Sequence, residues 1–236
     1  MEITGNRAAL VVAGGSGKRM KASLPKQFLK LQGRPILIHT LKRFLSFDAQ
    51  LAVILVLGRG FEPFWEEAIV HLTAEEAARI HVCAGGKDRT NSVANGLETL
   101  EKLVVSPNNF WVAIHDAVRP FVTHAMIQTA FEAAEKTGAA VCCVPVKSSL
   151  RQKTEDGSQP VDRSQFFHVQ TPQTFHLASI LTAYTQRPHD LFTDDASLFQ
   201  AHGRAVEICE GSYDNLKITT PEDLLIAEKL LAGPVG

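Results

Sequence analysis

The chain has 236 residues, of which 24 are Lys or Arg and 25 are Asp or Glu, so its net charge is close to zero. This balance argues against a protein that coats nucleic acid and against one that binds membranes through a polybasic surface. The length is sufficient for one sizeable α/β domain with a well-filled core.

The apolar runs and the cysteines exclude further classes of protein. The longest apolar runs have about the length of a buried strand, whereas a membrane-spanning helix needs roughly 20 residues. The N-terminal residues lack the cationic start and apolar stretch of a signal peptide. The four cysteines include no C-x-x-C pair, which argues against disulfides and against a zinc site. We therefore expect a cytoplasmic protein with reduced cysteines.

Short apolar segments alternate with segments of helical periodicity along the chain. Thr123 is expected to cap a helix that ends at Gly138, and Thr220 to cap another with Pro221 at its first position. Strands that alternate with helices predict an α/β fold with a mostly parallel sheet, covered by helices on both faces. The expected strands are residues 8–13, 51–57, 79–83, 110–115, 139–145 and 205–209.

The first expected strand runs into a turn that contains Gly14, Gly15 and Gly17. Backbone N–H groups in such a turn are not covered by side chains, and they form a concave site for anionic oxygens. The turn matches neither the Walker A pattern nor a dinucleotide-binding fingerprint. Arg19 and Lys26 follow closely and favour a triphosphate-binding site, while a plain strand-to-helix turn is the alternative.

The segment HDAVRP follows the strand expected at 110–115. Ligands of open α/β sheets bind at the carboxyl ends of strands, near the point where the strand order reverses. Asp116 lies at such an end, where a carboxylate can bind a ribose hydroxyl or a hydrated Mg²⁺ held by phosphates. Capping of a helix is the alternative role for Asp116. His115 is expected to be a packed or hydrogen-bonded histidine.

Residues 146–165 interrupt the alternation of strands and helices. They are polar, have no helical stripe, and contain Asp156-Gly157, which is a hairpin turn signal. A loop of this length within a compact domain is more often functional or paired than idle. We interpret it as an extended two-stranded arm inserted in a single domain that spans residues 1–236.

Three further polar stretches are expected to lie outside regular elements. They are VQTPQTF, FTDDASL and YDNLKITTPEDL, which contain Thr171, Thr193 and Lys217 respectively. Thr193-Asp194-Asp195 also has the form of a helix start. Lys217 lies between two apolar residues, and a lysine that leans inward there needs an anionic partner.

Taken together, these motifs resemble those of the 2-C-methyl-D-erythritol 4-phosphate cytidylyltransferase family. The matching segments occur in order from residue 13 to residue 224. They are AGGSGKRM with PKQF, GGKDRTNSV, HDAVRPF, VDR, QTPQTF, TDDAS and DNLKITTPEDL. Each segment is weak by itself, but the ordered set is highly specific.

The resemblance implies a Rossmann-like nucleotidyltransferase domain and a homodimer in which the arms at 146–165 clasp and complete the partner's active site. It implies transfer of CMP from CTP to 2-C-methyl-D-erythritol 4-phosphate, a sugar-alcohol phosphate, with release of pyrophosphate, as a step of non-mevalonate isoprenoid biosynthesis. It also implies dependence on Mg²⁺. The ion is expected to be held through the CTP phosphates, with Asp116 as the one candidate protein ligand. No nucleic acid or membrane partner is expected.

The roles of single residues follow from the same resemblance. Arg19 and Lys26 correspond to the pair that stabilises the transition state, and Arg163 and Lys217 to the pair that positions the sugar phosphate. The positions that correspond to nucleotide contacts are Ala13, Gly14, Gly15, Gly17, Gly86, Ser92 and Asp116. Those that correspond to the acceptor pocket are Arg119, Ser149, Thr171 and Thr193.

The sequence departs from the family pattern at three places. The glycine turn begins Val-Ala-Gly-Gly instead of Pro-Ala-Ala-Gly, Lys87 stands where some members have an acid, and Ser149 stands where Thr is expected. The glycine pair also occurs in ribitol-5-phosphate cytidylyltransferases, so another polyol phosphate is an alternative acceptor. TDDAS and VDRS favour the methylerythritol enzyme. A nucleotide-binding regulatory module is the non-enzymatic alternative. It is disfavoured because all four basic residues with expected catalytic roles are present, namely Arg19, Lys26, Arg163 and Lys217.

Overall fold

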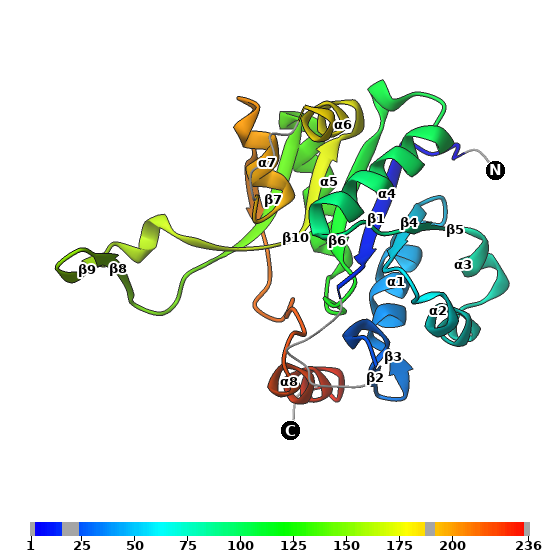
Figure 1. Cartoon of the computed structure of the whole chain (residues 1–236), viewed down its shortest axis with the longest axis horizontal. Coiled ribbons are helices and arrows are strands. Elements are labelled where there is room, and N and C mark those ends of the chain that lie inside the picture. Colours follow the sequence, from blue (N-terminus) through cyan, green and yellow to red (C-terminus); the bar gives the residue numbers. More distant parts are fainter. Residues whose placement is uncertain (1–2, 16–23, 187–191, 234–236) are drawn as a thin grey trace.

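The computed structural model describes residues 3–15, 24–186 and 192–233, which form a sheet with helices on both sides and a projecting arm (Figure 1). The strands of the main sheet are β1 (Arg7–Ala13), β4 (Ala52–Leu57), β5 (Ile80–Ala84), β6 (Trp111–Asp116), β7 (Ala139–Pro145), β10 (Phe167–His176) and β11 (Glu207–Glu210). The α-helices are α1 (Ile36–Phe47), α2 (Glu62–Ala68), α3 (Ala74–Ala78), α4 (Arg89–Leu103), α5 (His124–Thr137), α6 (Leu177–Thr185), α7 (Asp195–Ala201) and α8 (Pro221–Leu231).

The main sheet has the strand order β11-β7-β10-β6-β1-β4-β5. Of these strands, β10 runs antiparallel to both of its neighbours, whereas the pairs β7–β11, β6–β1, β1–β4 and β4–β5 are parallel. The strand order therefore reverses at β1, because the chain passes from β1 to β4 and β5 on one side and then returns to β6 on the other. This confirms the predicted, mostly parallel sheet.

Helices cover both faces because the residues of each central strand alternate between two cores. On β1, Ala9 and Val11 pack into the core that contains α1, α2 and α5, whereas Ala8 and Leu10 pack into the core that contains α4, α6 and α7. Burial on both faces explains why the central strands are nearly continuous apolar runs. A smaller core joins α8 to Leu31 of the small hairpin of β2 (Lys30–Leu31) and β3 (Arg34–Pro35).

The expected helix signals are confirmed. The side chain of Thr123 accepts a hydrogen bond from the backbone of Met126, and Gly138 ends α5 in the left-handed conformation. Thr220 and Asp223 form a reciprocal capping box at the start of α8, with Pro221 at its first position. The expected strand at 139–145 matches β7 at both ends, and the other expected strands differ from the observed ones by one or two residues.

One expectation for the sheet is wrong. The stretch VQTPQTF was predicted to lie outside regular elements, but it belongs to β10, next to the centre of the sheet. The register of β10 against β7 shifts between Val169 and Gln173, which accommodates Pro172, a residue without a backbone donor. Gln170, Thr171, Gln173 and Thr174 are buried although they are polar, and this composition hides the strand.

The predicted arm is present and projects from the body of the molecule (Figure 1). It consists of β8 (Leu150–Thr154) and β9 (Gly157–Val161), which are antiparallel, followed by a short 3₁₀ turn (Arg163–Gln165). The tight turn is formed by residues 155–156, and Gly157 follows with a positive φ of 133°. In the described part of the chain, no helix is long and apolar enough to cross a membrane.

Candidate active site

The carboxyl ends of four parallel strands meet at one edge of the sheet. Val12 of β1 lies opposite Asp116 of β6, and Leu57 of β4 lies between Ala13 and Ala84 on its two neighbouring strands. Glycines follow three of these strand ends directly, at positions 14, 58 and 85. Because the strand order reverses at β1, this edge is where an α/β sheet places its ligand.

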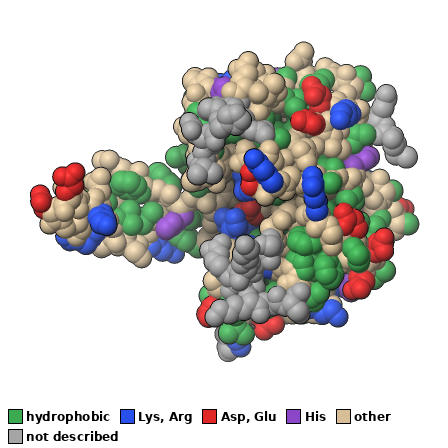
Figure 2. Space-filling model, in the orientation of Figure 1, with side chains coloured by type: hydrophobic (Ala, Val, Ile, Leu, Met, Phe, Trp, Pro, Cys, Tyr) green, Lys and Arg blue, Asp and Glu red, His purple; other side chains and the backbone are tan. Residues whose placement is uncertain are grey.

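Two pockets open at this edge. The first has a volume of about 400 Å³ and is lined by the residues after β1, the turn around Lys26, the start of α4 and the end of β6. The second, of about 310 Å³, is lined by β10, the start of α7 and the segment after β6. Arg89, Asp116 and Lys217 line both pockets, so the two pockets adjoin. Figure 2 shows basic side chains, in blue, gathered near the place where the arm leaves the body.

Lys26 is held at the first pocket by its neighbours in the chain. Gln27 is buried and donates a hydrogen bond from Nε2 to the backbone oxygen of Ala13, at a distance of 2.7 Å. Phe28 packs in the core with Phe61 and Phe64. The 3₁₀ turn Lys26–Phe28 is thereby fixed against the end of β1, with Lys26 lining the first pocket.

The second glycine segment is fixed to the first turn of α4. The Gly86 N–H donates to Oγ of Ser92 at 3.0 Å, and that hydroxyl donates to the backbone oxygen of Asp88 at 2.7 Å. A β-carbon on Gly86 would lie 2.4 Å from Cβ of Asn91, so the close approach requires glycine. Asp88 caps α4 by accepting a hydrogen bond from the Asn91 N–H. Gly86 and Ser92 therefore line a preformed wall of the first pocket.

Asp116 is the electrostatic centre of the site. Its Oδ2 atom lies 3.0 Å from Nζ of Lys217 and 3.1 Å from Nε of Arg119. Burial would raise the pKa of Asp116, but Lys217, Arg119 and Arg89 outweigh burial and hold the pKa well below its usual value. Asp116 is therefore ionised near neutral pH. The prediction that Lys217 needs an anionic partner is confirmed.

A network of buried amides positions the segment that carries Lys217. The side chain of Gln170 donates to the backbone oxygen of Ser212 and accepts from its N–H. Asn215 is fully buried and donates to the backbone oxygen of Thr171 at 2.9 Å, while its own backbone oxygen accepts from Arg119 at 2.8 Å. The polar residues of β10 therefore hold Lys217 and Arg119 beside Asp116.

His115 is buried and does not line either pocket. Its Nε2–H donates to the backbone oxygen of Arg119 at 3.2 Å, and Nδ1 has no hydrogen-bond partner in the described part of the chain. Burial lowers the pKa of His115 to about 4, so the ring is neutral near pH 7. The expectation of a packed, hydrogen-bonded histidine is confirmed.

Comparisons with known proteins now decide the family. The model of the 2-C-methyl-D-erythritol 4-phosphate cytidylyltransferase family matches residues 8–233, which is nearly the whole chain. The chain belongs to this family. It is therefore a nucleotidyltransferase of the non-mevalonate pathway of isoprenoid biosynthesis, and the resemblance read from its motifs is confirmed.

Relatives and solved structures agree with this membership. The chain is 43% identical to the 2-C-methyl-D-erythritol 4-phosphate cytidylyltransferase of Bacteroides thetaiotaomicron, over 95% of this chain and 99% of the relative. It is 44% identical to that of Porphyromonas gingivalis, over 95% and 97%. The crystal structure of the Thermus thermophilus enzyme aligns with a TM-score of 0.73 and 31% identity, covering 98% of this chain and all of that one. The 4-diphosphocytidyl-2C-methyl-D-erythritol synthase of Anaerococcus prevotii aligns with a TM-score of 0.80 and 27% identity, covering 96% of each chain.

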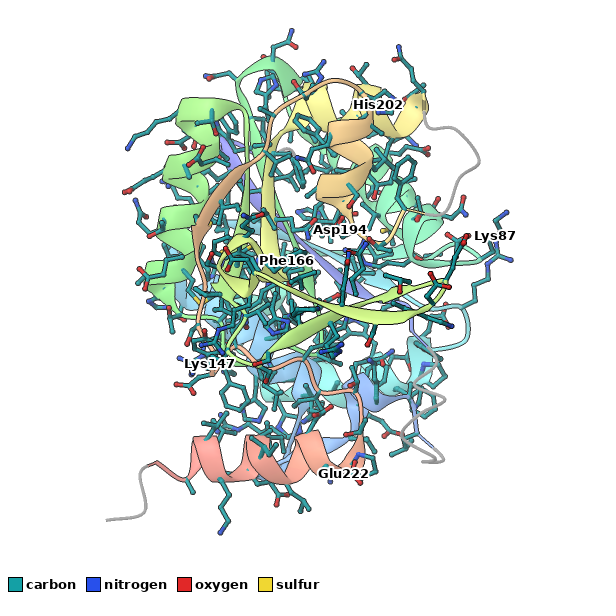
Figure 3. The ribbon with its side chains drawn as sticks, turned by 90° about the vertical axis from the view of Figure 1, so that its left-hand side faces the viewer. Lys87, Lys147, Phe166, Asp194, His202 and Glu222 are labelled. Atoms are coloured by element: carbon teal, nitrogen blue, oxygen red, sulfur yellow. The ribbon has the colours of Figure 1, made fainter. Side chains whose placement is uncertain are left out.

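Most residues that the family motifs select come together at the two pockets. Figure 3, a view from the side of the arm, labels Lys87 of the first pocket and Asp194 of the second. The selected residues that line the first pocket are Ala13, Gly14, Gly15, Lys26, Gly86, Ser92, Asp116 and Lys217. Those that line the second are Asp116, Arg119, Thr171, Thr193 and Lys217.

Two of the selected residues that the structure describes are not brought to the pockets. Arg163 and Ser149 lie on the exposed arm and line neither pocket of their own chain. Arg163 donates a hydrogen bond to the backbone oxygen of Lys147 within the arm. Gly17 and Arg19 lie outside the described residues.

Sequence reasoning missed several residues that build the site of this cytidylyltransferase. Arg89 lines both pockets, and Gln170 and Gln173 line the second. Arg89 carries a signal in the sequence, because an arginine directly after Asp88 occupies the first turn of a capped helix that follows two glycines. The glutamines carry none, because their role depends on the burial of β10.

Proposed function

We propose that the two pockets hold CTP and 2-C-methyl-D-erythritol 4-phosphate side by side and transfer CMP between them. The first pocket, with its two glycine segments and Lys26, suits CTP, and the second suits the acceptor. One observation carries this assignment: Arg89, Asp116 and Lys217 line both pockets, so the α-phosphorus of CTP and the acceptor phosphate can meet there.

The reaction needs little proton transfer from the protein. The acceptor phosphate is largely dianionic near neutral pH, so one of its oxygens attacks the α-phosphorus directly while the bond from that phosphorus to pyrophosphate breaks. The buried, neutral His115 does not line either pocket, in keeping with a reaction that needs no general base. The main obstacle is the repulsion between two anions, which fixed cations reduce.

The cations divide this task between the two phosphates. Lys26, together with Arg19, serves the triphosphate and the departing pyrophosphate. Lys217 serves the acceptor phosphate, and its pairing with Asp116 fixes the ammonium before the substrate arrives. A cation that is already oriented stabilises the transition state without reorganisation during the reaction.

We also propose that the enzyme uses Mg²⁺. The described residues contain no cluster of three metal-ligating side chains, but Asp116 lines both pockets. This suits Mg²⁺, which proteins commonly bind through one or two carboxylates together with substrate phosphates. When bound, the ion would offset negative charge on the triphosphate, and Asp116 would hold it from the protein side.

The arm supports the proposal of a homodimer. An isolated two-stranded hairpin is marginally stable in water, yet β8 and β9 project from the body with mostly exposed residues. Phe166, Phe167 and Val169 are exposed at its base, with 42 to 47% of their surface accessible. A second copy of the chain would cover these residues and bring Arg163 to the partner's acceptor pocket.

A release assay tests the function. The purified protein is incubated with CTP, Mg²⁺ and one acceptor at a time, namely 2-C-methyl-D-erythritol 4-phosphate or ribitol 5-phosphate, and pyrophosphate is measured. We expect release with the first acceptor and little with the second. Turnover of ribitol 5-phosphate alone would contradict the acceptor assignment, and binding of CTP without turnover of either would favour a regulatory module.

A further inference from the structure

We propose that Arg89 is a positioning residue that holds the acceptor pocket in register with the nucleotide pocket. The proposal rests on the function proposed above, and it assigns the task to a side chain that lies in the motif GGKDRTNSV but was given no role by the resemblance. Arg89 is the first residue of α4. The glycine segment of the first pocket precedes this helix and is hydrogen-bonded to its first turn. The Arg89 guanidinium reaches across to α7, which carries part of the wall of the second pocket.

The contact across the two pockets is a bidentate ion pair. Nη1 of Arg89 lies 2.9 Å from Oδ1 of Asp195, and Nη2 lies 2.6 Å from Oδ2. The Asp195 side chain is completely buried, whereas that of Arg89 is 31% exposed. The planar guanidinium matches both carboxylate oxygens, so the pair fixes direction as well as distance. The hydroxyl of Tyr184 on α6 also donates to Oδ1 of Asp195.

Asp195 lies directly beside residues of the second pocket. Asp194 caps α7 by accepting a hydrogen bond from the Ser197 N–H, and Thr193 precedes it; all three residues line the pocket. The side chain of Gln173 attaches the same helix start to β10, through Asp194 and the Ala196 N–H. The start of α7 is therefore held to the sheet through Gln173, to α6 through Tyr184, and to the wall of the nucleotide pocket through Arg89.

The contacts made by Gln173 and by Arg89 have different consequences. Gln173 and the start of α7 both belong to the acceptor side, so their contact shapes that pocket by itself. The contact of Arg89 with Asp195 sets where the acceptor pocket stands relative to the glycine segment at 85–88. In-line attack needs this relative placement, because a displacement of about 1 Å can cost on the order of a hundredfold in rate.

The proposal is tested by steady-state kinetics of Arg89→Met, Arg89→Lys and Asp195→Asn, with CTP affinity measured separately by calorimetry without acceptor. We expect kcat/KM for the acceptor to fall by about tenfold to a hundredfold in Arg89→Met and Asp195→Asn. The dissociation constant for CTP should change by less than about threefold. Arg89→Lys should recover part of the loss, because an ammonium keeps the charge but cannot span both oxygens.

Two further proteins separate positioning from folding and from direct catalysis. Arg7→Ala breaks a surface pair with Glu135 at the opposite edge of the sheet and is the matched control, which should keep both constants. In the double variant Arg89→Met/Asp195→Asn, the loss should match that of the more impaired single variant, because both changes remove one contact. Melting curves show whether each protein is folded. Arg89→Lys keeps a positively charged partner for buried Asp195, so its kinetics test the proposal if the other variants do not fold.

The opposing results are distinct. A folded Asp195→Asn enzyme with normal kinetics beside an impaired Arg89→Met would mean that Arg89 contacts substrate directly, and the proposal would be wrong. Equal losses of CTP affinity and acceptor kcat/KM would also overturn it, because the pair would then support the nucleotide pocket. Failure of the proposed function itself would appear in the unmodified protein, as absence of pyrophosphate release.

Discussion

The cleft formed by the two adjoining pockets and the projecting arm hold their cations in different ways. In the cleft, Lys217 and Arg119 pair with the carboxylate of Asp116, and Arg89 pairs with Asp195. On the arm, Arg151 donates to the hydroxyl and backbone oxygens of Ser158, and Arg163 donates to a backbone oxygen. Among the residues that the structure describes, neither arm arginine has a carboxylate partner.

This difference indicates which cations the chain orients by itself. A cation beside a buried carboxylate is fixed before any substrate binds, because the folded core sets the position of the carboxylate. An arginine bound to backbone oxygens of an exposed hairpin has only a local restraint. The comparison therefore predicts that the cleft works as a unit within one chain, and that Arg163 depends on a second copy.

The largest effect should come from removing a cation of the cleft. Lys26→Ala is expected to lower kcat by about a hundredfold, or about 3 kcal/mol of barrier, as for other single electrostatic stabilisers. The measurement is pyrophosphate release at saturating CTP and acceptor. Lys42→Ala is the matched control, because Lys42 pairs with Glu76 away from both pockets and should keep the normal rate. A near-normal rate for Lys26→Ala would remove Lys26 from the mechanism.

Mixing two impaired variants tests whether the arm acts across a dimer. Arg163→Ala should also lose most activity. If its guanidinium enters the partner's site, an equal mixture with Lys26→Ala contains hybrid dimers with one intact site. Complete exchange should then restore about a quarter of the normal sites.

The mixing experiment has its own control. A mixture of Lys26→Ala with the double variant Lys26→Ala/Arg163→Ala contains no dimer with an intact site and should stay inactive. Subunit exchange is confirmed with differently tagged chains. Absence of recovery in the first mixture, after confirmed exchange, would show that Lys26 and Arg163 act within one chain, so the arm would not depend on a second copy.

Two glycines give a smaller but sharper contrast between the regions. In Gly86→Ala, the new methyl group would lie 2.4 Å from Cβ of Asn91, so the glycine segment must move. We expect the dissociation constant for CTP to rise about tenfold, or about 1.4 kcal/mol. Gly157→Ala disfavours the positive φ at the arm's turn but should leave CTP affinity within about twofold of normal. Equal CTP affinities in the two variants would mean that the conformation of the segment at Gly86 does not affect CTP binding.

The same contrast explains what the sequence could predict. The glycine turn, Lys26 and Asp116 follow buried strands, so their place at one sheet edge follows from apolar runs and the rule for strand ends. The arm was predictable because its polarity and turn signal are local. Strand β10 and its buried glutamines were not predictable from the sequence. Their burial depends on contacts with β6, β7 and the segment before Lys217, which are distant in sequence. The pair of Arg89 with Asp195 joins residues 106 positions apart and leaves no periodic signal.

Acid should destabilise the region around the cleft more than the arm. His115 is buried beside Asp116, and its pKa is lowered from 6.5 to about 4. Below pH 6.5 the unfolded chain therefore binds a proton at this position that the folded chain does not, so the free energy of unfolding falls as the pH falls. From pH 7 to pH 5, this one group should remove about 2 kcal/mol, and the loss should level off below pH 4. Asp116 adds a loss of the same sign at more acidic pH, below its ordinary pKa of 3.8.

The contribution of His115 is isolated by comparing denaturant unfolding of the unmodified protein with that of His115→Gln at several pH values. The glutamine amide can donate to the backbone oxygen of Arg119 in place of Nε2–H, but it does not titrate. Burial also lowers the pKa values of His39 and His81, so both proteins should lose some stability in acid, and the difference between the two curves reports His115. Parallel curves between pH 7 and pH 5 would mean that the ring accepts its proton in the folded state. That would require Nδ1, which has no partner among the described residues, to reach an acceptor or water, and acid would then not destabilise the core through His115.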